Sequence, residues 1–294
     1  MATGTEAAAG HAPTASEYIV HHLTFWNTSG HPQKAVVDFS LLNIDTLFYS
    51  ILLGVVTVFC LWLAARRATS GVPGRFQAAV EILVEMVADQ AKGLIHSAES
   101  RKFVAPLALT VFVWIFLMNS MDFLPLDLLP RAWQAIVANG GGDPEHAFMR
   151  VVPTADLNAT FGLSIGVLLV CLFYNVKIKG AGGWVHELLS APFGAKWYLA
   201  PFNLLLNIIE FLAKTVSHGM RLWGNMFAGE LLFMLIALMG AAFTGWQFGS
   251  IALWFGQVLA GSAWAIFHIL IVALQAFIFM MLTLVYVGQA HEGH

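Results

Sequence analysis

The most unusual residues of this sequence are charged and titratable side chains that lie inside apolar segments. Residues 231–291 contain no Asp, Glu, Lys or Arg, but His268 lies among them. The apolar segment before them contains Lys214, Arg221 and Glu230. An arginine near the centre of a bilayer costs roughly 2.5 to 17 kcal/mol, depending on the method and on how much water follows it. Histidine and glutamate bind and release protons, whereas arginine effectively keeps its proton, so these residue types point to proton transport.

The spacing of the polar residues around Arg221 places them on one face of a helix. At about 100° per residue, six of them fall within about 40° of Arg221. They are Asn203, Asn207, Glu210, Lys214, Ser217 and Asn225. One interpretation of this face is a polar seam between two helices, which explains the asparagines and the serine but not an arginine.

The two cations on this face lie at different depths. Lys214 is about 15 residues into its helix, and its long side chain could reach back to the cytoplasmic surface. Arg221 is about 22 residues in, or about 33 Å along the axis. We therefore expect a functional role for Arg221 and leave both interpretations open for Lys214.

Glu230 lies on another face of the same helix. It follows Arg221 by nine residues, which turns it about 180° round the axis and carries it about 13.5 Å along it. On the last apolar segment, His268 and Gln275 are seven residues apart and share a face. Because antiparallel packing reverses the direction, His268 is expected near the level of Glu230, and Gln275 near that of Arg221. We predict that Glu230 and His268 are partners on a proton path open to the outside; the alternative for His268 is a hydrogen-bonded packing residue.

Asp122, together with Asn119 and Ser120, closes an earlier apolar span. It is either a helix-end charge at the interface or part of an outer vestibule. The histidines show no metal-ligand spacing such as HxxxH, and there is no phosphate loop, nucleophile elbow or nucleotide fingerprint. We therefore expect no metal, no cofactor, no catalytic residues and no chemistry on ATP in this chain.

Membrane helices must hold these residues, because 59% of the 294 residues are hydrophobic and only 11% are charged. An average soluble domain has about 25% charged residues, so an ordinary soluble enzyme is excluded. The net charge of −3 leaves no basic surplus for binding nucleic acid. Cys60 and Cys171 each lie in an apolar run, so we expect neither a disulfide framework nor a cysteine metal site.

A membrane-spanning helix needs about 20 mostly apolar residues. The sequence predicts an all-α membrane protein with about five transmembrane helices, the last two long and tilted. Their approximate ranges are 46–66, 103–122, 157–176, 199–241 and 250–288. Gly240, Gly245 and Gly249 supply the break between the last two. Residues 75–100 mix charged with apolar side chains, which predicts an interfacial amphipathic helix.

Lysine and arginine predict the orientation, because cytoplasmic loops are enriched in them. With the N-terminus outside, nine of these residues fall in inner segments and three in outer ones. The outer three are Lys34, Arg131 and Arg150. We expect residues 1–44 to be a periplasmic tail, flexible up to about Ser16, residues 45–290 to be one transmembrane domain, and residues 291–294 to be a cytoplasmic tail.

Residues 220–230, with the sequence MRLWGNMFAGE, resemble the signature of subunit a of F-type ATP synthases, where an RLxGNxxAGE segment surrounds the essential arginine. The last helix is also similar to that family's C-terminal helix, through WAIFHIL at 264–270 and QAFIF at 275–279. Residues 119–130 and 150–156, with the sequences NSMDFLPLDLLP and RVVPTAD, resemble its bacterial members.

This resemblance covers roughly residues 40–290 and implies a mechanism. Subunit a stands beside a rotating ring of c subunits, each with one carboxylate inside the membrane. Two offset aqueous half-channels connect the ring to opposite sides. The resemblance implies that Arg221 faces the ring, keeps the arriving carboxylate ionised and prevents direct proton leakage. Asn225 and Gln275 would support the arginine.

The resemblance also assigns residues to each half-channel. Glu230 and His268 would line the outer one, and Asp122 is a candidate for its vestibule. The candidates for the cytoplasmic one are Glu210, Lys214 and Ser217. Some relatives carry the cytoplasmic carboxylate one turn earlier, where this chain has Asn207, and Glu210 would substitute for it on the same face.

Partners and location follow from the same resemblance. They are the c ring, the peripheral-stalk b subunit and the rest of the F1F0 complex in a bacterial inner membrane, with protons or Na⁺ as the transported ion. The residues alone also allow an ion-coupled secondary transporter, but such transporters usually show inverted repeats, and none pairs the first two spans with the last two. A simple membrane anchor does not explain Arg221.

Overall fold

The computed structural model describes residues 15–29, 40–69, 71–125, 127–143, 147–241, 245 and 247–291. Within these ranges the regular structure is helical, apart from one isolated bridge between Asn27 and Asn43. Most of the segment expected to be flexible lies outside the described residues. Of the expected cytoplasmic tail, only His291 is described.

Among the described residues, five helical segments are long and apolar enough to cross a membrane, which confirms the predicted class of fold. Four of them are single helices, and in the second the short helix η1 (Met121–Phe123) directly continues α4. The five long helices are α2 (Ile44–Arg67), α4 (Ala98–Ser120), α6 (Leu157–Ser190), α7 (Ala200–Ala241) and α8 (Phe248–Gln289).

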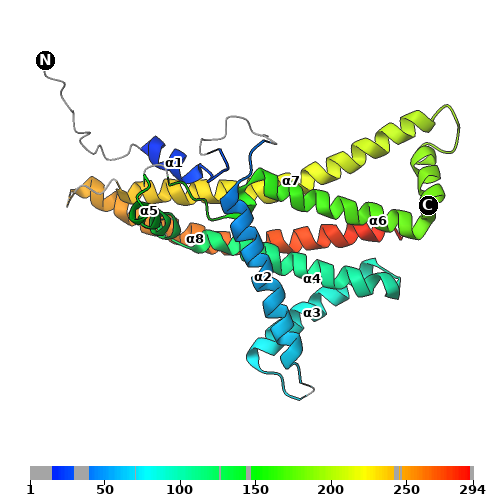
Figure 1. The fold of residues 1–294 in the computed structure, drawn as a ribbon, viewed down its shortest axis with the longest axis horizontal. Coiled ribbons are helices and arrows are strands. Elements are labelled where there is room, and N and C mark those ends of the chain that lie inside the picture. The colour runs from blue at the N-terminus through cyan, green and yellow to red at the C-terminus, as the bar shows by residue number, and fades with distance from the viewer. Residues whose placement is uncertain are drawn as a thin grey trace.

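The last two helices are longer than the hydrocarbon layer of a bilayer is thick. Each has 42 residues, which corresponds to about 63 Å against a hydrocarbon thickness of about 30 Å. Figure 1 shows that α4, α6, α7 and α8 run along the long axis of the molecule, whereas α2 crosses them steeply. The two groups of helices therefore cannot both lie along the membrane normal, and the tilt of the last two stays a prediction.

The predicted interfacial helix is two helices in the structure. α3 (Arg75–Leu94) ends near Leu94, and α4 begins at Ala98 after Ser97, whose side chain accepts a hydrogen bond from the backbone N–H of Ser100. The position of α3 relative to a membrane surface stays a prediction. The third span also runs further than expected, to Ser190, with a break at Gly180, where φ is 72°.

Two short helices, α1 (Ala15–Leu23) and α5 (Leu128–Asn139), lie at one end of the molecule. The 3-10 turn η3 (Pro153–Ala155) precedes α6 and packs on the middle of α7. Figure 1 shows α1 and α5 near the end where α7 stops and α8 begins. The carboxylate of Asp45, in the first turn of α2, accepts backbone hydrogen bonds from Trp26 at 2.9 Å and Arg150 at 3.0 Å. This carboxylate therefore joins the N-terminal segment and the loop before α6 to the start of α2.

α7 packs mainly against α6 and α8, and α8 packs also against α4. Leu222 and Met226 of α7 are fully buried in a cluster with Val272 and Ala276 of α8. The opposite face of α7 is uncovered, and apolar side chains such as Leu212 are exposed there. One side of α7 thus belongs to the core, and the other is open to whatever surrounds the chain.

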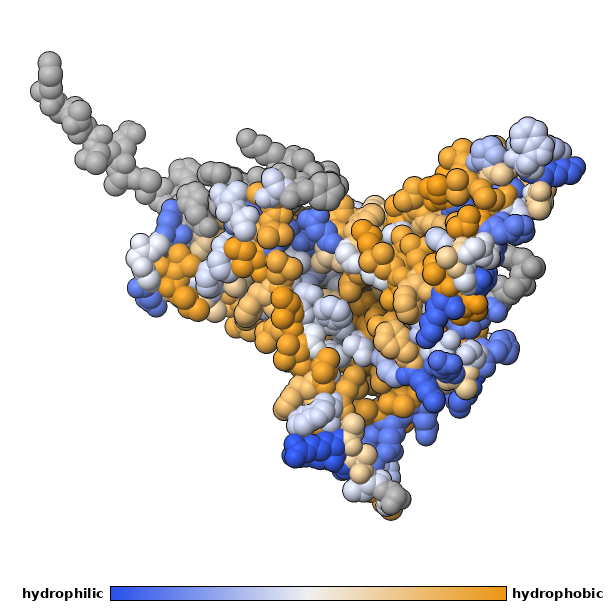
Figure 2. Space-filling view, turned by 45° about the vertical axis from the view of Figure 1, so that its right-hand side comes forward, coloured by the Kyte–Doolittle hydropathy of each residue, from blue (hydrophilic) through white to orange (hydrophobic). Residues whose placement is uncertain are grey.

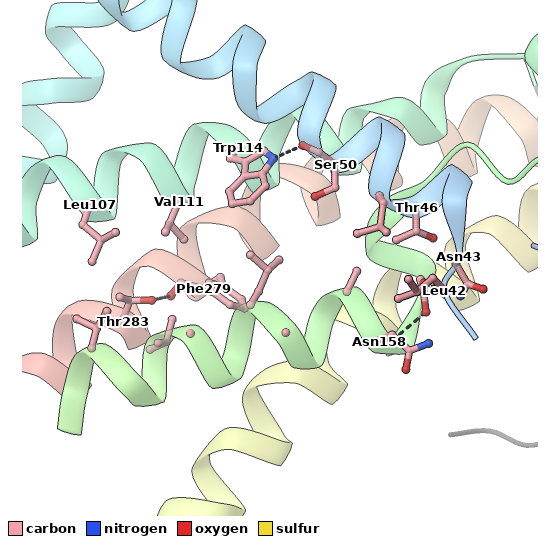
Figure 3. A pocket seen from close by; sticks show the side chains of 18 of the residues that line it. Leu42, Asn43, Thr46, Ser50, Leu107, Val111, Trp114, Asn158, Phe279 and Thr283 are labelled. Carbon is pink, nitrogen blue, oxygen red and sulfur yellow. Dashed lines mark hydrogen bonds between the residues drawn. The ribbon is translucent and has the colours of Figure 1, made fainter. Parts of the chain in front are cut away.

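The surface and one sizeable cavity are both mainly apolar. Figure 2 shows hydrophobic side chains over most of one face, with hydrophilic ones at its right-hand end and at the lower tip where α2 and α3 meet. A cavity of about 560 Å³ lies among α2, α4, α6 and α8, where the indole N–H of Trp114 donates to the carbonyl of Ser50 at 2.9 Å (Figure 3). None of the residues predicted to carry protons lines it.

Candidate functional site

Arg221 lies on the border between the buried and the exposed side of α7. The next residue, Leu222, is fully buried, whereas Ser217 and Asn225, on the same face as Arg221, are exposed. Among the described residues, no carboxylate pairs with the Arg221 guanidinium and no side-chain hydrogen bond is made by it. Arg221 is thus a cation inside a candidate membrane span with no counter-charge among the described residues.

Gln275 lies where the helical arithmetic places it. The amide N–H of Asn225 donates to the side-chain oxygen of Gln275 at 2.7 Å, and Gln275 is only 3% exposed. This hydrogen bond joins α7 to α8 one turn beyond Arg221. It positions an amide pair beside the guanidinium.

Glu230 has a different partner from the one predicted. Its carboxylate forms a buried ion pair with Arg150, whose Nε donates to the two carboxylate oxygens at 3.3 and 3.1 Å and whose Nη2 also donates. Both residues are about 95% buried, at 4% and 5% exposure. The guanidinium also lies over the ring of Phe25, 4.6 Å from its centroid, so the N-terminal segment covers the pair. The prediction that His268 is the partner of Glu230 is therefore wrong.

His268 contacts Asp122 instead. Its Nε2 lies 2.6 Å from Oδ2 of Asp122, and the histidine is fully buried. His268 lies at the level of Glu230, as predicted. The imidazole is so close to Gly229, the residue before Glu230, that a Cβ added there would lie 2.3 Å from Cε1 of the ring. Gly229 is thus the residue that lets the ring approach α7 so closely. Asp122 is buried, and the interpretation as an interfacial helix-end charge does not fit it.

A small cavity connects these two pairs. It measures about 30 Å³, the volume of about one liquid water molecule. Buried polar groups around such a space are usually satisfied by ordered water, and water can carry a proton between them. We call it the outer cavity. Its polar lining residues are His22, Asp122, Arg150 and Glu230.

A larger polar cavity lies at the other end of the same helices. It measures about 210 Å³, room for several water molecules, and we call it the inner cavity. Nζ of Lys214 lies 2.6 Å from Glu210 and 2.9 Å from the side-chain oxygen of Gln289. Across the cavity, Lys179 pairs with Glu187 at 2.7 Å. Its other polar lining residues are Asn175, Asn207 and Tyr286.

His218 lies between the inner cavity and Arg221. It is 2% exposed, packs edge-on against Phe279 and has no hydrogen-bond partner for either ring nitrogen among the described residues. It lines a space of about 20 Å³ that shares Lys214 and Tyr286 with the inner cavity. A small, mainly apolar space therefore lies next to the inner cavity and reaches His218, within one turn of Arg221.

Comparison with known proteins identifies what this arrangement belongs to. The sequence pattern of the family described as "ATP synthase A chain" matches residues 47–288. The chain belongs to the ATP synthase A chain family. The resemblance seen at residues 220–230 and in the last helix is thereby confirmed.

Similar proteins cover nearly the whole chain. "ATP synthase subunit a" of Paracidovorax citrulli (strain AAC00-1) and that of Acidovorax sp. (strain JS42) are each 63% identical to it over 294 residues, which is 98% of this chain and 100% of the relative. "ATP synthase subunit a" of Verminephrobacter eiseniae (strain EF01-2) is 58% identical over the same shares. Within this family, the chain is a multi-pass membrane protein with five candidate spans.

Two asparagines on the Arg221 face have a structural role that fits the polar-seam interpretation. The amide of Asn203 donates to the carbonyl of Leu189 at 2.9 Å, and that of Asn207 donates to the carbonyls of Leu188 and Ala191 at 3.0 and 2.9 Å. They fasten the beginning of α7 to the end of α6. Glu210, Lys214 and Ser217 follow them toward Arg221 and are not used in this way.

Sequence reasoning missed two members of the outer cavity. Arg150 was counted as a loop charge that orients the chain, and His22 was part of a tail with no expected role. The one available signal for Arg150 was its place in the RVVPTAD segment that resembles the bacterial members of the family. His22 lies before the part of the chain that the family pattern matches.

Proposed function

We propose that this chain is the proton-conducting stator subunit of the F0 sector of an ATP synthase and is not catalytic by itself. The observation that carries the proposal is Arg221, an unpaired cation at an uncovered face, with separate polar cavities toward the two ends of its helix. The family and the names of the relatives support it.

The outer half-channel passes through the outer cavity. A proton from the periplasmic side reaches Asp122, His268 and Glu230, whose groups accept and release protons. The Asn225–Gln275 hydrogen bond lies between these residues and Arg221 along the helices. From there the proton neutralises a carboxylate of the c ring, which can then enter the lipid.

Arg221 separates the two half-channels. A fixed guanidinium lowers the pKa of a carboxylate beside it, so the arriving ring carboxylate gives up its proton. Arginine does not release its own proton, so no proton is relayed across it. The released proton leaves through the inner half-channel, past Ser217, Lys214 and Glu210, to the cytoplasm.

The proposed function also implies partner subunits and an orientation in the membrane. The c ring covers the exposed face of α7, the b subunit of the peripheral stalk holds the chain, and the rest of the F1F0 complex makes ATP. The membrane is the inner membrane of a bacterium. The N-terminus is periplasmic and the C-terminus cytoplasmic, which the distribution of lysine and arginine supports.

The substitution Arg221→Ala tests the proposal. We expect it to abolish proton-driven ATP synthesis in inverted membrane vesicles, because the ring carboxylate no longer loses its proton, while the complex remains assembled with active ATP hydrolysis. Arg66→Ala, at an exposed arginine of α2, is the matched control and should leave synthesis unchanged. Near-normal synthesis with Arg221→Ala would contradict the proposal.

A further inference from the structure

The N-terminal helix α1 places a titratable pair at the outer cavity. Nε2 of His22 lies 3.0 Å from Oδ1 of Asp127, which directly precedes α5. The hydroxyl of Tyr18 donates to the same oxygen at 3.1 Å, and Arg131 pairs with the other oxygen at 2.7 Å. These contacts hold α1 against the start of α5.

The geometry of His22 defines which nitrogen can exchange a proton. Nδ1 lies 3.0 Å from the backbone carbonyl of Tyr18, and a carbonyl can only accept, so Nδ1 carries a hydrogen. Nε2 faces a carboxylate oxygen, which is also an acceptor. Since two acceptors do not approach to 3.0 Å without a hydrogen between them, the His22–Asp127 contact holds one proton at Nε2 or at the carboxylate.

The pair connects bulk water with the cavity. The side chain of Asp127 is 34% exposed and that of His22 13% exposed, so water reaches both. His22 also lines the outer cavity, together with the buried Asp122, Arg150 and Glu230. One imidazole therefore touches the outside and the enclosed space.

The charges around His22 oppose one another. The carboxylates around it are those of Asp127 and, across the cavity, Asp122 and Glu230, and the guanidinium groups are those of Arg131 and Arg150. Burial and the neighbouring Asp127 raise the pKa of Tyr18 to about 12, so its hydroxyl stays protonated and acts only as a donor to Asp127. The ring of His21 lies 5.7 Å from that of His22 and lines no part of the outer cavity.

We propose that His22 and Asp127 form a proton-loading site at the entrance of the outer cavity. This inference rests on the proposed function and extends the outer path into α1, which lies before the region matched by the family pattern. The observed contact is the loaded state, with one proton between Nε2 and Asp127. The pair passes that proton to a water molecule in the cavity, the water gives one of its own protons to a cavity carboxylate, and hydronium from bulk water reloads the pair.

The test measures potential-driven proton uptake into liposomes that contain the purified F0 complex, at a series of pH values equal on both sides. His22→Ala should lower the rate of proton uptake about tenfold near neutral pH. A positioned proton-transfer group typically contributes a factor of about 10²–10⁴ to a rate, and the effect is smaller here because water in the cavity carries part of the flux. The deficit should shrink at acidic pH. Imidazole should restore the rate, whereas 1,3-dimethylimidazolium, which cannot carry a proton, should not.

Two further variants separate proton transfer from a structural role. In His22→Gln, the side-chain amide can still bridge the Tyr18 carbonyl and Asp127 but does not titrate. This variant should therefore show the same deficit in proton uptake as His22→Ala, with a normal subunit content. His21→Gln is the matched control and should behave as the wild type.

Two results would overturn the inference: unchanged uptake with His22→Gln, or a deficit in both His22 variants that is equal at every pH and insensitive to imidazole. Loss of ATP synthesis with Arg221→Ala alongside either result would leave the proposed function intact.

Discussion

The outer and inner cavities contain the same kinds of residues but are built differently. In the outer cavity, Arg150 and Glu230 are 80 residues apart in sequence and both buried. In the inner cavity, Glu210 and Lys214 are one turn apart on α7, and their side chains are 58% and 28% exposed. The outer ion pair exists only when the whole fold is in place, whereas the inner one needs only a helix.

This difference sets how each cavity responds to change. A buried charge that loses its partner cannot recover its hydration, whereas an exposed one is rehydrated by water. The outer cavity is also small, at about 30 Å³ against about 210 Å³, so a shift of one side chain alters all its contacts. Substitutions should therefore cost far more at the outer end than at the inner end.

Arg150→Met should have the largest effect, because it leaves the carboxylate of Glu230 buried and unpaired. We expect a loss of about 3 to 5 kcal/mol in the free energy of unfolding. Unfolding of the detergent-solubilised protein with increasing SDS measures this loss. Adding Glu230→Gln to Arg150→Met removes the stranded charge and should restore part of it. If Arg150→Met alone were as stable as the wild type, the two cavities would not differ in their sensitivity to the loss of an ion-pair partner.

Gly229→Ala should have an intermediate effect. The added Cβ would lie 2.3 Å from Cε1 of His268, so the ring must move away from Asp122. Overpacking of this kind costs about 1 to 3 kcal/mol, and proton uptake should fall with it. Gly166→Ala on α6 is the control, because its Cβ would meet nothing within 4 Å. Equal behaviour of the two alanine variants would mean that His268 is not held against α7.

Glu210→Gln should have the smallest effect on stability. The Glu210–Lys214 pair spans one helical turn and is partly exposed, so its loss should change the free energy of unfolding by no more than about 0.5 kcal/mol. The same SDS unfolding series measures it. A loss as large as that of Arg150→Met would remove the distinction between the two ends.

Helical periodicity was sufficient for contacts between long helices. It predicted the depths of Gln275 and His268 from their spacing alone, and the structure has Gln275 bonded to Asn225. Helical periodicity did not predict the partner of Glu230, because that partner is not in a helix. Arg150 comes from a loop, where no periodicity exists to fix which way a side chain points.

The ends of helices were also beyond what the sequence pattern could decide. The apolar pattern of the third span fades after residue 176, but the helix continues to Ser190 through charged residues. The N-terminal segment has no apolar run to suggest that α1 packs on α5, and its contacts are polar ones between distant residues such as Tyr18 and Asp127. Hydrophobic periodicity carries no information about such contacts.

The asparagines at the start of α7 have a mechanical consequence. The 42-residue helix packs on α6 and α8 along its length, and these two amides add a polar attachment at its first two turns. Asn203 and Asn207 transfer the bending load to main-chain carbonyls of α6 and the turn after it, which cannot yield by changing rotamer as a side-chain contact can. Two amides thus add stiffness against torque at the end of α7 where Asn207 also lines the inner cavity.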